Sequence, residues 1–340
     1  MVKLGVGILG NGMATRVFHA PLIGAVPQLE LRAIHARSAG AISPVAGVPL
    51  VQDLEAMLAD PEIGLITVAT PSATHAQLAE RALLAGKHVV VEKPFALELA
   101  QAQALVALAR GRGLCLAAFH NRRWDSDFMA VRTAIEAGAI GQVVHFESHF
   151  DRFRPQVRER WREDGSAGSG VWFDLGPHMV DQALVLFGMP LAVSADMGAL
   201  RPGAKGVDWA HVVLRYADKR VILHAGLCVA GGVPRFAVHG TGGSLVKQKA
   251  DPQEAQSVAG LPPQDAAWGV DEDPLLHYTG EGAPLELPVP RGCQQSFYQR
   301  MAQACLGEGE APNKPEEILG VQAIIEAAIL SAEEGRVVPL

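Results

Sequence analysis

The sequence predicts an α/β protein: a Rossmann domain with a doubly wound parallel sheet, followed by an α+β domain with an open, mostly antiparallel sheet. Three observations favour this fold: a length of 340 residues, alternating strand and helix patterns before His120, and consecutive strand patterns with short turns after it. We expect one domain at residues 1–120 and a second domain at residues 121–340.

The composition is that of an ordinary globular protein, with 49% hydrophobic and 19% charged residues. A net charge of -7 argues against nucleic-acid binding. No apolar stretch approaches the roughly 20 residues needed to cross a membrane. The 4 cysteines lie far apart and lack the spacing of metal ligands, which favours reduced thiols, a cytoplasmic location and no metal site.

The first predicted strand, Val2–Leu9, leads into a glycine loop and a helix. One frame of the Gly-x-Gly-x-x-Gly motif begins at Gly5, but it leaves too little chain ahead of it for a strand. We prefer the frame that begins at Gly10, in which Thr15 replaces the usual third glycine; a turn without a ligand is the alternative. Such glycines let a pyrophosphate approach the free amides of a helix amino terminus. The predicted binding residues are Gly10, Gly12, Met13, Ala14 and Thr15.

The second predicted strand, Leu29–Ala36, lacks the acidic residue that would bind the ribose of NAD at its end. Arg37 and Ser38 stand there instead, and a guanidinium and a hydroxyl can bind a 2'-phosphate. We therefore expect NADP(H) to be preferred, while NAD(H) stays open. The alternative is that Arg37 is an exposed arginine in a turn.

The segment His88–Pro94 contains three consecutive valines and ends at a proline, as expected for a buried strand that stops abruptly. Glu92 and Lys93 then lie at the carboxyl end of a strand, where parallel α/β sheets form their ligand crevice. A lysine that merely solvates the strand end is the alternative.

A strand at Ile63–Ala69 and a helix that ends near Gly86 precede this segment. A helix at Leu97–Arg110 and a strand at Leu114–Phe119 follow it. Around these elements, further candidates for the cofactor side of the crevice are Thr70, Pro71, His75 and Glu92, although His75 is of a type that more often caps or packs a helix.

The pattern changes after His120. The expected elements are a helix at Asp127–Ala137, strands at Gln142–Phe150, Ala210–Tyr216, Val221–Val229 and Phe236–His239, and a final helix from Pro315 to about Glu334, which could pack on either domain. We expect residues 249–291, which are rich in Pro, Gly and Asp, to form an irregular loop.

Asp174 and His178 are four residues apart, on either side of a Gly-Pro pair that we place at a helix start. If both lie in the first helical turns, they share one side of the helix. A carboxylate beside a histidine can hold the imidazole in a useful tautomer. The alternative is that Asp174 caps the helix and His178 is a core histidine.

These motifs resemble the Gfo/Idh/MocA oxidoreductases. The glycine loop, AGKHVVVEKP and GSGVWFDLGPHMVDQAL match that family in order and spacing. The segments VFHAPLI, FHNRRWDSDF and HFESHFDRFRP resemble a bacterial subgroup that includes NADP-dependent scyllo-inositol dehydrogenases.

The resemblance implies that Lys93 contacts the reacting hydroxyl, His178 exchanges its proton and Asp174 orients the lysine or the substrate. It also implies a cis bond between Lys93 and Pro94 and a homodimer or homotetramer that associates through the exposed face of the second sheet. Arg152, Arg154 and Trp161 either line the substrate mouth or solvate the surface.

The resulting hypothesis is an NADP(H)-dependent oxidoreductase of a cyclitol or sugar, with inositols the first candidates. The rivals are a reductase of another carbonyl or dihydrodiol substrate and a non-catalytic NADP-binding sensor.

Overall fold

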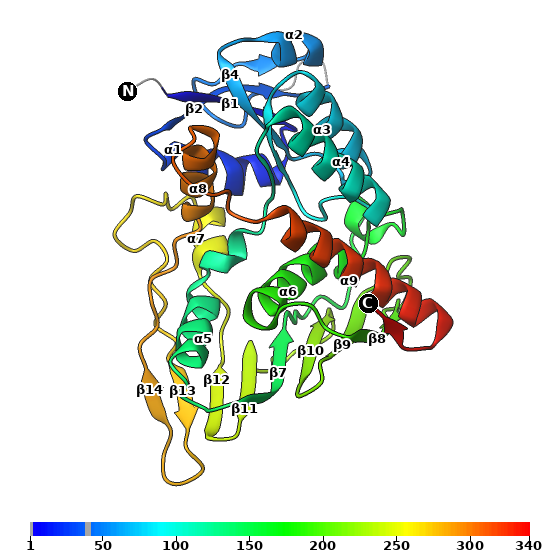
Figure 1. The fold of residues 1–340 in the computed structure, drawn as a ribbon, viewed down its shortest axis with the longest axis vertical. Coiled ribbons are helices and arrows are strands. Elements are labelled where there is room, and N and C mark those ends of the chain that lie inside the picture. The colour runs from blue at the N-terminus through cyan, green and yellow to red at the C-terminus, as the bar shows by residue number, and fades with distance from the viewer. Residues whose placement is uncertain (1–2, 38–41) are drawn as a thin grey trace. The chain divides into compact units, whose positions relative to one another are not determined.

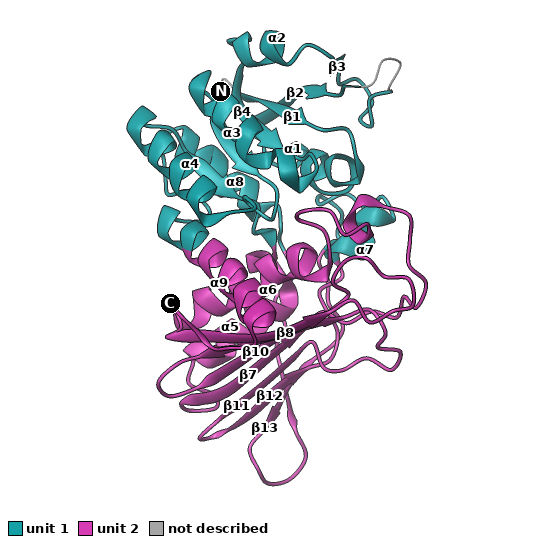
Figure 2. Ribbon diagram, turned by 90° about the vertical axis from the view of Figure 1, so that its right-hand side faces the viewer, with its two compact units in different colours: residues 1–121, 253–268, 293–319 teal, residues 122–252, 269–292, 320–340 magenta. Residues whose placement is uncertain are grey.

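The computed structural model describes residues 3–37 and 42–340. The chain forms two compact units, each assembled from three stretches of sequence (Figure 2). The first unit contains Met1–Asn121, Gln253–Trp268 and Cys293–Leu319. The second contains Arg122–Pro252, Gly269–Gly292 and Gly320–Leu340. Late segments of the chain therefore complete the amino-terminal unit.

The first unit contains a parallel sheet of 6 strands in the order β3-β2-β1-β4-β5-β6, the doubly wound arrangement that the sequence predicts. Figure 1 labels β1, β2 and β4 of this sheet. Its strands are β1 (Leu4–Leu9), β2 (Leu29–His35), β3 (Leu50–Val51), β4 (Ile63–Val68), β5 (His88–Val91) and β6 (Leu116–Ala118). Its helices are η1 (Thr15–His19), α1 (Ala20–Gly24), α2 (Leu54–Ala59), η2 (Ser72–Thr74), α3 (His75–Leu84), α4 (Leu99–Arg112), α7 (Gln253–Val258) and α8 (Ser296–Cys305).

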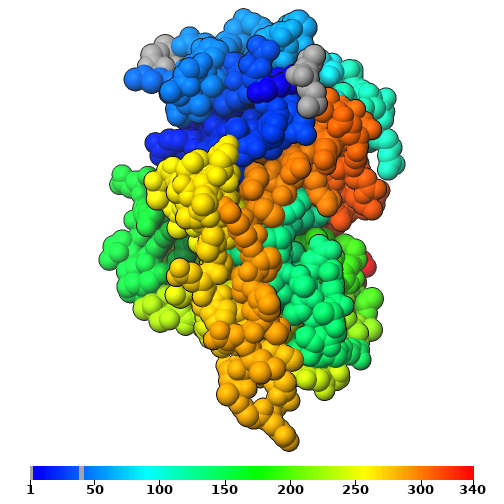
Figure 3. Space-filling model, turned by 90° about the vertical axis from the view of Figure 1, so that its left-hand side faces the viewer, coloured from blue at the N-terminus to red at the C-terminus, as the bar shows by residue number. Residues whose placement is uncertain are grey.

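The core of this unit explains why its central strands are easy to recognise. Val89 and Val91 of β5 pack with Ile66 and Val68 of β4 in a buried cluster that also takes Leu83 from α3. Strands covered on both faces carry continuous apolar runs, so β-branched residues mark them clearly. The late segment 253–268, yellow in Figure 3, lies against the blue amino-terminal residues, and α7 contacts η1.

The second unit contains a sheet of 9 strands in the order β14-β13-β12-β11-β7-β10-β9-β8-β15. All its pairs are antiparallel except β7 with β10, so the prediction of a mostly antiparallel sheet is confirmed. Its strands are β7 (Val143–His149), β8 (Ala192–Gly198), β9 (Trp209–Arg215), β10 (Arg220–Gly226), β11 (Phe236–Gly240), β12 (Gly243–Lys247), β13 (Leu275–Tyr278), β14 (Leu285–Leu287) and β15 (Val338–Pro339). Its helices include α5 (Ser126–Glu136), η4 (Trp161–Glu163) and α6 (Val171–Phe187); η3 (Asn121–Trp124) and α9 (Pro315–Glu334) begin in the first unit and continue here.

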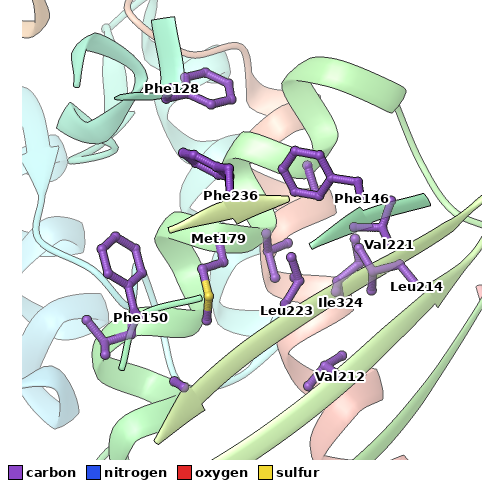
Figure 4. Packing of buried hydrophobic residues seen from close by; sticks show 14 of the residues in the cluster. Phe128, Phe146, Phe150, Met179, Val212, Leu214, Val221, Leu223, Phe236 and Ile324 are labelled. Carbon is purple, nitrogen blue, oxygen red and sulfur yellow. The ribbon is translucent and has the colours of Figure 1, made fainter. Parts of the chain in front are cut away.

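One face of this sheet forms the core of the second unit (Figure 4). Val221 and Leu223 of β10 point into it, together with Met179 of α6 and Ile324 of α9. The alternate residues of β10, such as His224, are only half-buried, because the other face of the sheet carries no helix of this unit (Figure 2).

The structure corrects two predictions. Residues 249–291 are not one irregular loop, because they contain α7, β13 and β14. These elements are only 3 to 6 residues long and lie among Gly, Pro and Asp, so turn signals hide them. The helix that holds Asp174 begins at Val171 rather than at the Gly-Pro pair. Gly170, with φ +92°, makes the sharp entry into that helix.

Within the described ranges, no helix is both long and apolar enough to cross a membrane.

Candidate functional site

The glycine loop after β1 has the geometry of a nucleotide-binding turn. Gly10 has φ +112°, and a Cβ there would lie 2.4 Å from the carbonyl oxygen of Ala69. Only glycine fits this turn without strain. A Cβ on Gly12, by contrast, would meet nothing within 4 Å, so the backbone stays open to a close approach.

The helix that follows keeps its first amides available. Met13 and Ala14 open it, and the first turn of a helix has no intrahelical partners for its N–H groups. Thr15, the departure from the glycine motif, is fully buried and donates its hydroxyl hydrogen to the carbonyl of Gly10 at 2.6 Å. Thr15 therefore braces the turn. These residues fit a pyrophosphate group, whose negative charge the amides would bind.

Arg37 lies just beyond the carboxyl end of β2, and its side chain is exposed. The backbone N–H of Gly10 donates to the carbonyl of His35 at 2.9 Å, so the glycine loop and the end of β2 are adjacent. Arg37 thus lies at the carboxyl-end edge of the sheet, where the ribose end of a dinucleotide binds in this type of fold. Ser38, the other predicted phosphate ligand, lies outside the described residues.

Lys93 follows β5 by two residues and is half-buried, and its bond to Pro94 is cis, as the resemblance implies. Glu92 anchors the segment. One oxygen of its carboxylate accepts from the backbone N–H of Lys93 at 2.9 Å, and the other lies 3.1 Å from Nε2 of His19. The backbone at Lys93 is therefore held in place by the buried side chain of Glu92.

His19 extends this anchor into a buried network. Its Nδ1 lies 2.7 Å from the hydroxyl of Tyr298, which in turn lies 3.1 Å from the hydroxyl of Thr67. Burial alone would raise the pKa of Glu92, but the hydrogen bond and charge of His19, together with Lys93, lower that pKa to about 2. Glu92 is therefore held as a carboxylate behind Lys93.

His75 joins two backbone segments on the same edge of this sheet. Its Nδ1 lies 2.8 Å from the carbonyl of Pro94, and its Nε2 lies 2.8 Å from the carbonyl of Thr70. Burial lowers the pKa of this histidine. A neutral imidazole has a single N–H, so His75 donates to one of these two carbonyls, and its ring lies between the turn of Thr70 and Pro71 and the Lys93 segment.

Asp174 and His178 both lie within α6, one turn apart on the same side of the helix. Asp174 is inside the helix and is not its cap, because the cap position is occupied by Gly170. Its carboxylate lies 3.3 Å from Nε of Arg162. His178 is buried, with 5% exposure. Asp174 and His178 belong to the second unit, whereas Lys93 belongs to the first.

Asp174 lines a pocket of the second unit that is rich in arginine. Arg152 and Arg154 line the same pocket, whereas Trp161 does not and instead packs its ring 4.6 Å from the guanidinium of Arg162. Burial, followed by the charges of neighbouring arginines, lowers the pKa of Arg154. The full lining is Arg152, Arg154, Arg160, Arg162, Glu163, Gly170, Val171, Asp174, Leu175, Arg201, Gly206, Val207 and Leu227.

Arg201 connects the segments that line this pocket. Its guanidinium bonds to Glu163 at 2.8 Å and to Asp208 at 2.9 Å, and it also donates to the carbonyl of Arg154 at 2.8 Å. All three charged side chains are buried. This buried group fixes the loop that presents the other arginines.

Sequence reasoning gave no role to His19 or Arg162. His19 stands in the apolar segment VFHAPLI, and a histidine in such a setting needs a buried polar partner. That signal could have singled it out. Nothing local could have paired Arg162 with Asp174, because a turn and the start of α6 separate them.

Comparison with known proteins agrees with this geometry. Two family models match the chain: "Oxidoreductase family, NAD-binding Rossmann fold" over residues 4–120, and "Oxidoreductase family, C-terminal alpha/beta domain" over residues 132–340. Both models are those of the Gfo/Idh/MocA oxidoreductases.

Similar proteins cover nearly the whole chain. The uncharacterized oxidoreductase YdgJ of Escherichia coli is 44% identical over 96% of both chains. The scyllo-inositol 2-dehydrogenase (NADP(+)) IolW of Bacillus subtilis is 35% identical over 98% of this chain and 95% of its own. A crystal structure of a Klebsiella pneumoniae protein is 45% identical, covers 100% of this chain and 96% of its own, and superposes with a TM-score of 0.93.

Proposed function

Because the chain belongs to the Gfo/Idh/MocA family of oxidoreductases, we propose that it transfers hydride between NADP(H) and a secondary alcohol of a cyclitol or sugar, with inositols as the first candidates. The observation that carries the proposal is the anchored Lys93, held at the carboxyl end of β5 by the Glu92–His19 pair. The similar protein IolW is a scyllo-inositol 2-dehydrogenase (NADP(+)), which supports both the inositol and the NADP parts of the proposal.

The glycine loop, the amides of the first helical turn and Arg37 would hold the cofactor. The nicotinamide, when bound, supplies the hydride donor or acceptor. Arg37 would select NADP(H), because a guanidinium at the end of β2 binds a 2'-phosphate where an acidic residue would repel it.

The proposed chemistry assigns a separate task to each of three side chains. The ammonium of Lys93 binds the reacting oxygen and stabilises the alkoxide character that develops as hydride leaves. A ring nitrogen of His178 takes the hydroxyl proton during oxidation and returns it during reduction. Asp174 orients the lysine or the substrate, and its contact with Arg162 fixes the direction of its carboxylate.

The experiment is an absorbance assay of the reduced nicotinamide with a panel of inositols and sugars, run with NADP and NAD in parallel. Turnover of scyllo- or myo-inositol with a strong preference for NADP is the expected result. Lys93→Ala should lower kcat by at least about 100-fold, the usual minimum for loss of one group that stabilises developing negative charge on oxygen. Lys3→Ala removes an exposed lysine of the same unit and should leave kcat unchanged.

Arg37→Ala separates the cofactor part of the proposal from the chemistry. We expect a KM for NADP at least about 10-fold higher, with little change in the KM for NAD, because one charge-assisted contact to the phosphate is lost. Equal effects on both cofactors would refute the role of Arg37.

Turnover of Lys93→Ala within a few-fold of the wild type would refute the catalytic assignment. Tight NADPH binding without turnover of any compound in the panel would favour a different substrate class or the non-catalytic sensor. Association into a homodimer or homotetramer stays a prediction, which sedimentation velocity at assay concentration tests directly.

A further inference from the structure

The open face of the second sheet carries a row of histidines that the proposed function does not use. His149 of β7 is paired with His224 of β10, and His224 is paired with His211 of β9. Directly paired residues on adjacent strands point to the same face. Val221 and Leu223 of β10 point into the core, so this row lies on the opposite, open face.

A carboxylate completes a compact group at one end of this row. Asp151 follows β7 by two residues, and its Oδ2 lies 3.4 Å from Nδ1 of His149. Its Oδ1 lies 3.5 Å from Nε2 of His224. One nitrogen of each histidine and one oxygen of the aspartate all lie within 4.8 Å of one another.

These separations fit one metal ion. A tetrahedral Zn²⁺ with ligands at about 2.0–2.1 Å places neighbouring ligand atoms about 3.3 Å apart. The separations of 3.4 Å from Nδ1 of His149 to Oδ2 and of 3.5 Å from Nε2 of His224 to Oδ1 are close to that value, so the carboxylate presents one oxygen toward each histidine. Two imidazoles and a carboxylate form a common three-ligand set for Zn²⁺, with a fourth position left to water.

Two of the candidate ligand atoms, Nδ1 of His149 and Oδ1 of Asp151, are buried and form no hydrogen bond. Each lies near another atom of the group, at 3.4 and 3.5 Å, without hydrogen-bond geometry. An unsatisfied buried polar atom is costly, and a bound cation would satisfy both at once. Gly226 keeps the space open, because a Cβ there would lie 3.2 Å from Oδ1 of Asp151 and 3.4 Å from Nε2 of His224.

The outer contacts of the group are those that orient metal-binding histidines. Nε2 of His149 lies 2.8 Å from a carboxylate oxygen of Glu147, which leaves Nδ1 as the ligand atom. Nδ1 of His224 lies 3.3 Å from Nδ1 of His211, which leaves Nε2 of His224 as the ligand atom. A carboxylate behind a metal-binding histidine fixes its tautomer and raises its basicity.

We propose that His149, Asp151 and His224 bind a divalent transition-metal cation, with Zn²⁺ as the expected occupant. The donor set of two nitrogens and one oxygen favours Zn²⁺ and chemically similar ions over Mg²⁺ and Ca²⁺, which prefer oxygen ligands. The inference concerns the second unit alone and is independent of the hydride-transfer proposal.

The test uses untagged full-length protein that has been stripped of metal and titrated with Co²⁺ and then with Zn²⁺. His88, Cys115 and Cys305 of the first unit form another group with ligand atoms within 4.8 Å. The titrations are therefore done with the Cys115→Ser variant, because Cys115 belongs to the first unit and its replacement leaves the second sheet unchanged. We expect one Co²⁺ per chain, with the intense visible bands of a site that has fewer than six ligands, and displacement of Co²⁺ by Zn²⁺.

Variants assign the metal to the sheet face. His224→Ala should abolish stoichiometric binding, and Glu147→Gln should weaken it about 10- to 100-fold, the usual effect of losing an orienting partner. His239→Ala is the matched control, because His239 lies on the neighbouring strand β11 and bonds Ser244 instead. No Co²⁺ uptake, or uptake that His224→Ala leaves unchanged, would overturn the proposal. Circular dichroism spectra that match the wild type confirm that the variants are folded.

Discussion

Replacing Glu92 by glutamine keeps the shape of the side chain but removes the charge that His19 and Lys93 stabilise. The pKa of Glu92 is lowered from its usual 4.5 to about 2. At about 1.4 kcal/mol for each pKa unit, this difference corresponds to about 3 kcal/mol of folding free energy at neutral pH. Glu92→Gln should therefore destabilise the first unit by about that amount at pH 7.

The stability difference between the wild type and Glu92→Gln should decrease as the pH falls. A carboxylate with a lowered pKa stabilises the fold at every pH above its unfolded pKa, and this stabilisation is lost as the pH falls toward the folded pKa. The difference between wild type and Glu92→Gln should be constant above about pH 5, roughly halved at pH 3 and almost absent near pH 2.

Amide hydrogen exchange of peptides from β4 and β5 measures the free energy of unfolding of the first unit alone. At pH 7 the variant should exchange about 100-fold faster in these strands. Glu62→Gln is the control, because Glu62 forms only an exposed ion pair with Arg32 at 3.2 Å. A difference for Glu92→Gln that is equally large at pH 7 and pH 3, or no difference at all, would refute the reasoning.

Two further predictions follow from the structure. Gly10→Ala should lower the midpoint of thermal unfolding and weaken binding of the nicotinamide cofactor, because φ is +112° and the new Cβ would lie 2.4 Å from the carbonyl oxygen of Ala69. In the control Gly12→Ala, the new Cβ meets nothing within 4 Å, so the midpoint of thermal unfolding should not change. Equal midpoints for the two variants would contradict the argument. Asp208→Ala should lower the free energy of unfolding in urea by about 3–5 kcal/mol, because it breaks a buried ion pair with Arg201. An unchanged urea midpoint would show that Glu163 alone suffices to hold Arg201.

The sequence was most informative where a single element carries its own signal. Val89–Val91 is a run of β-branched residues bounded by turn residues, and it proved to be β5. The strand β14, by contrast, consists only of Leu285, Glu286 and Leu287 and is largely exposed, so its alternation is too short to mark a strand. Its place in the sheet depends on pairing with β13, which local pattern does not reveal.

The same limit applies to the functional groups. Lys93 could be placed at a strand end from its own neighbours, but its anchor, His19, lies 73 residues from Glu92. The prediction that the chain has no metal site rested on cysteine spacing, and the Co²⁺ titration decides between it and the proposed site at His149, Asp151 and His224. His149 and His224 approach one another only through the parallel pairing of β7 with β10, which no sequence motif announces.

The late segments of the first unit affect how the protein is made. Phe297 packs its ring 4.9 Å from that of Phe119, and Tyr298 closes the buried network around His19. A nascent chain that ends at residue 120 therefore contains the sequences of all 6 strands of the parallel sheet but lacks these two aromatic rings. The cofactor-binding unit is finished only after residue 319 has emerged, so its last folding step follows synthesis of most of the second unit.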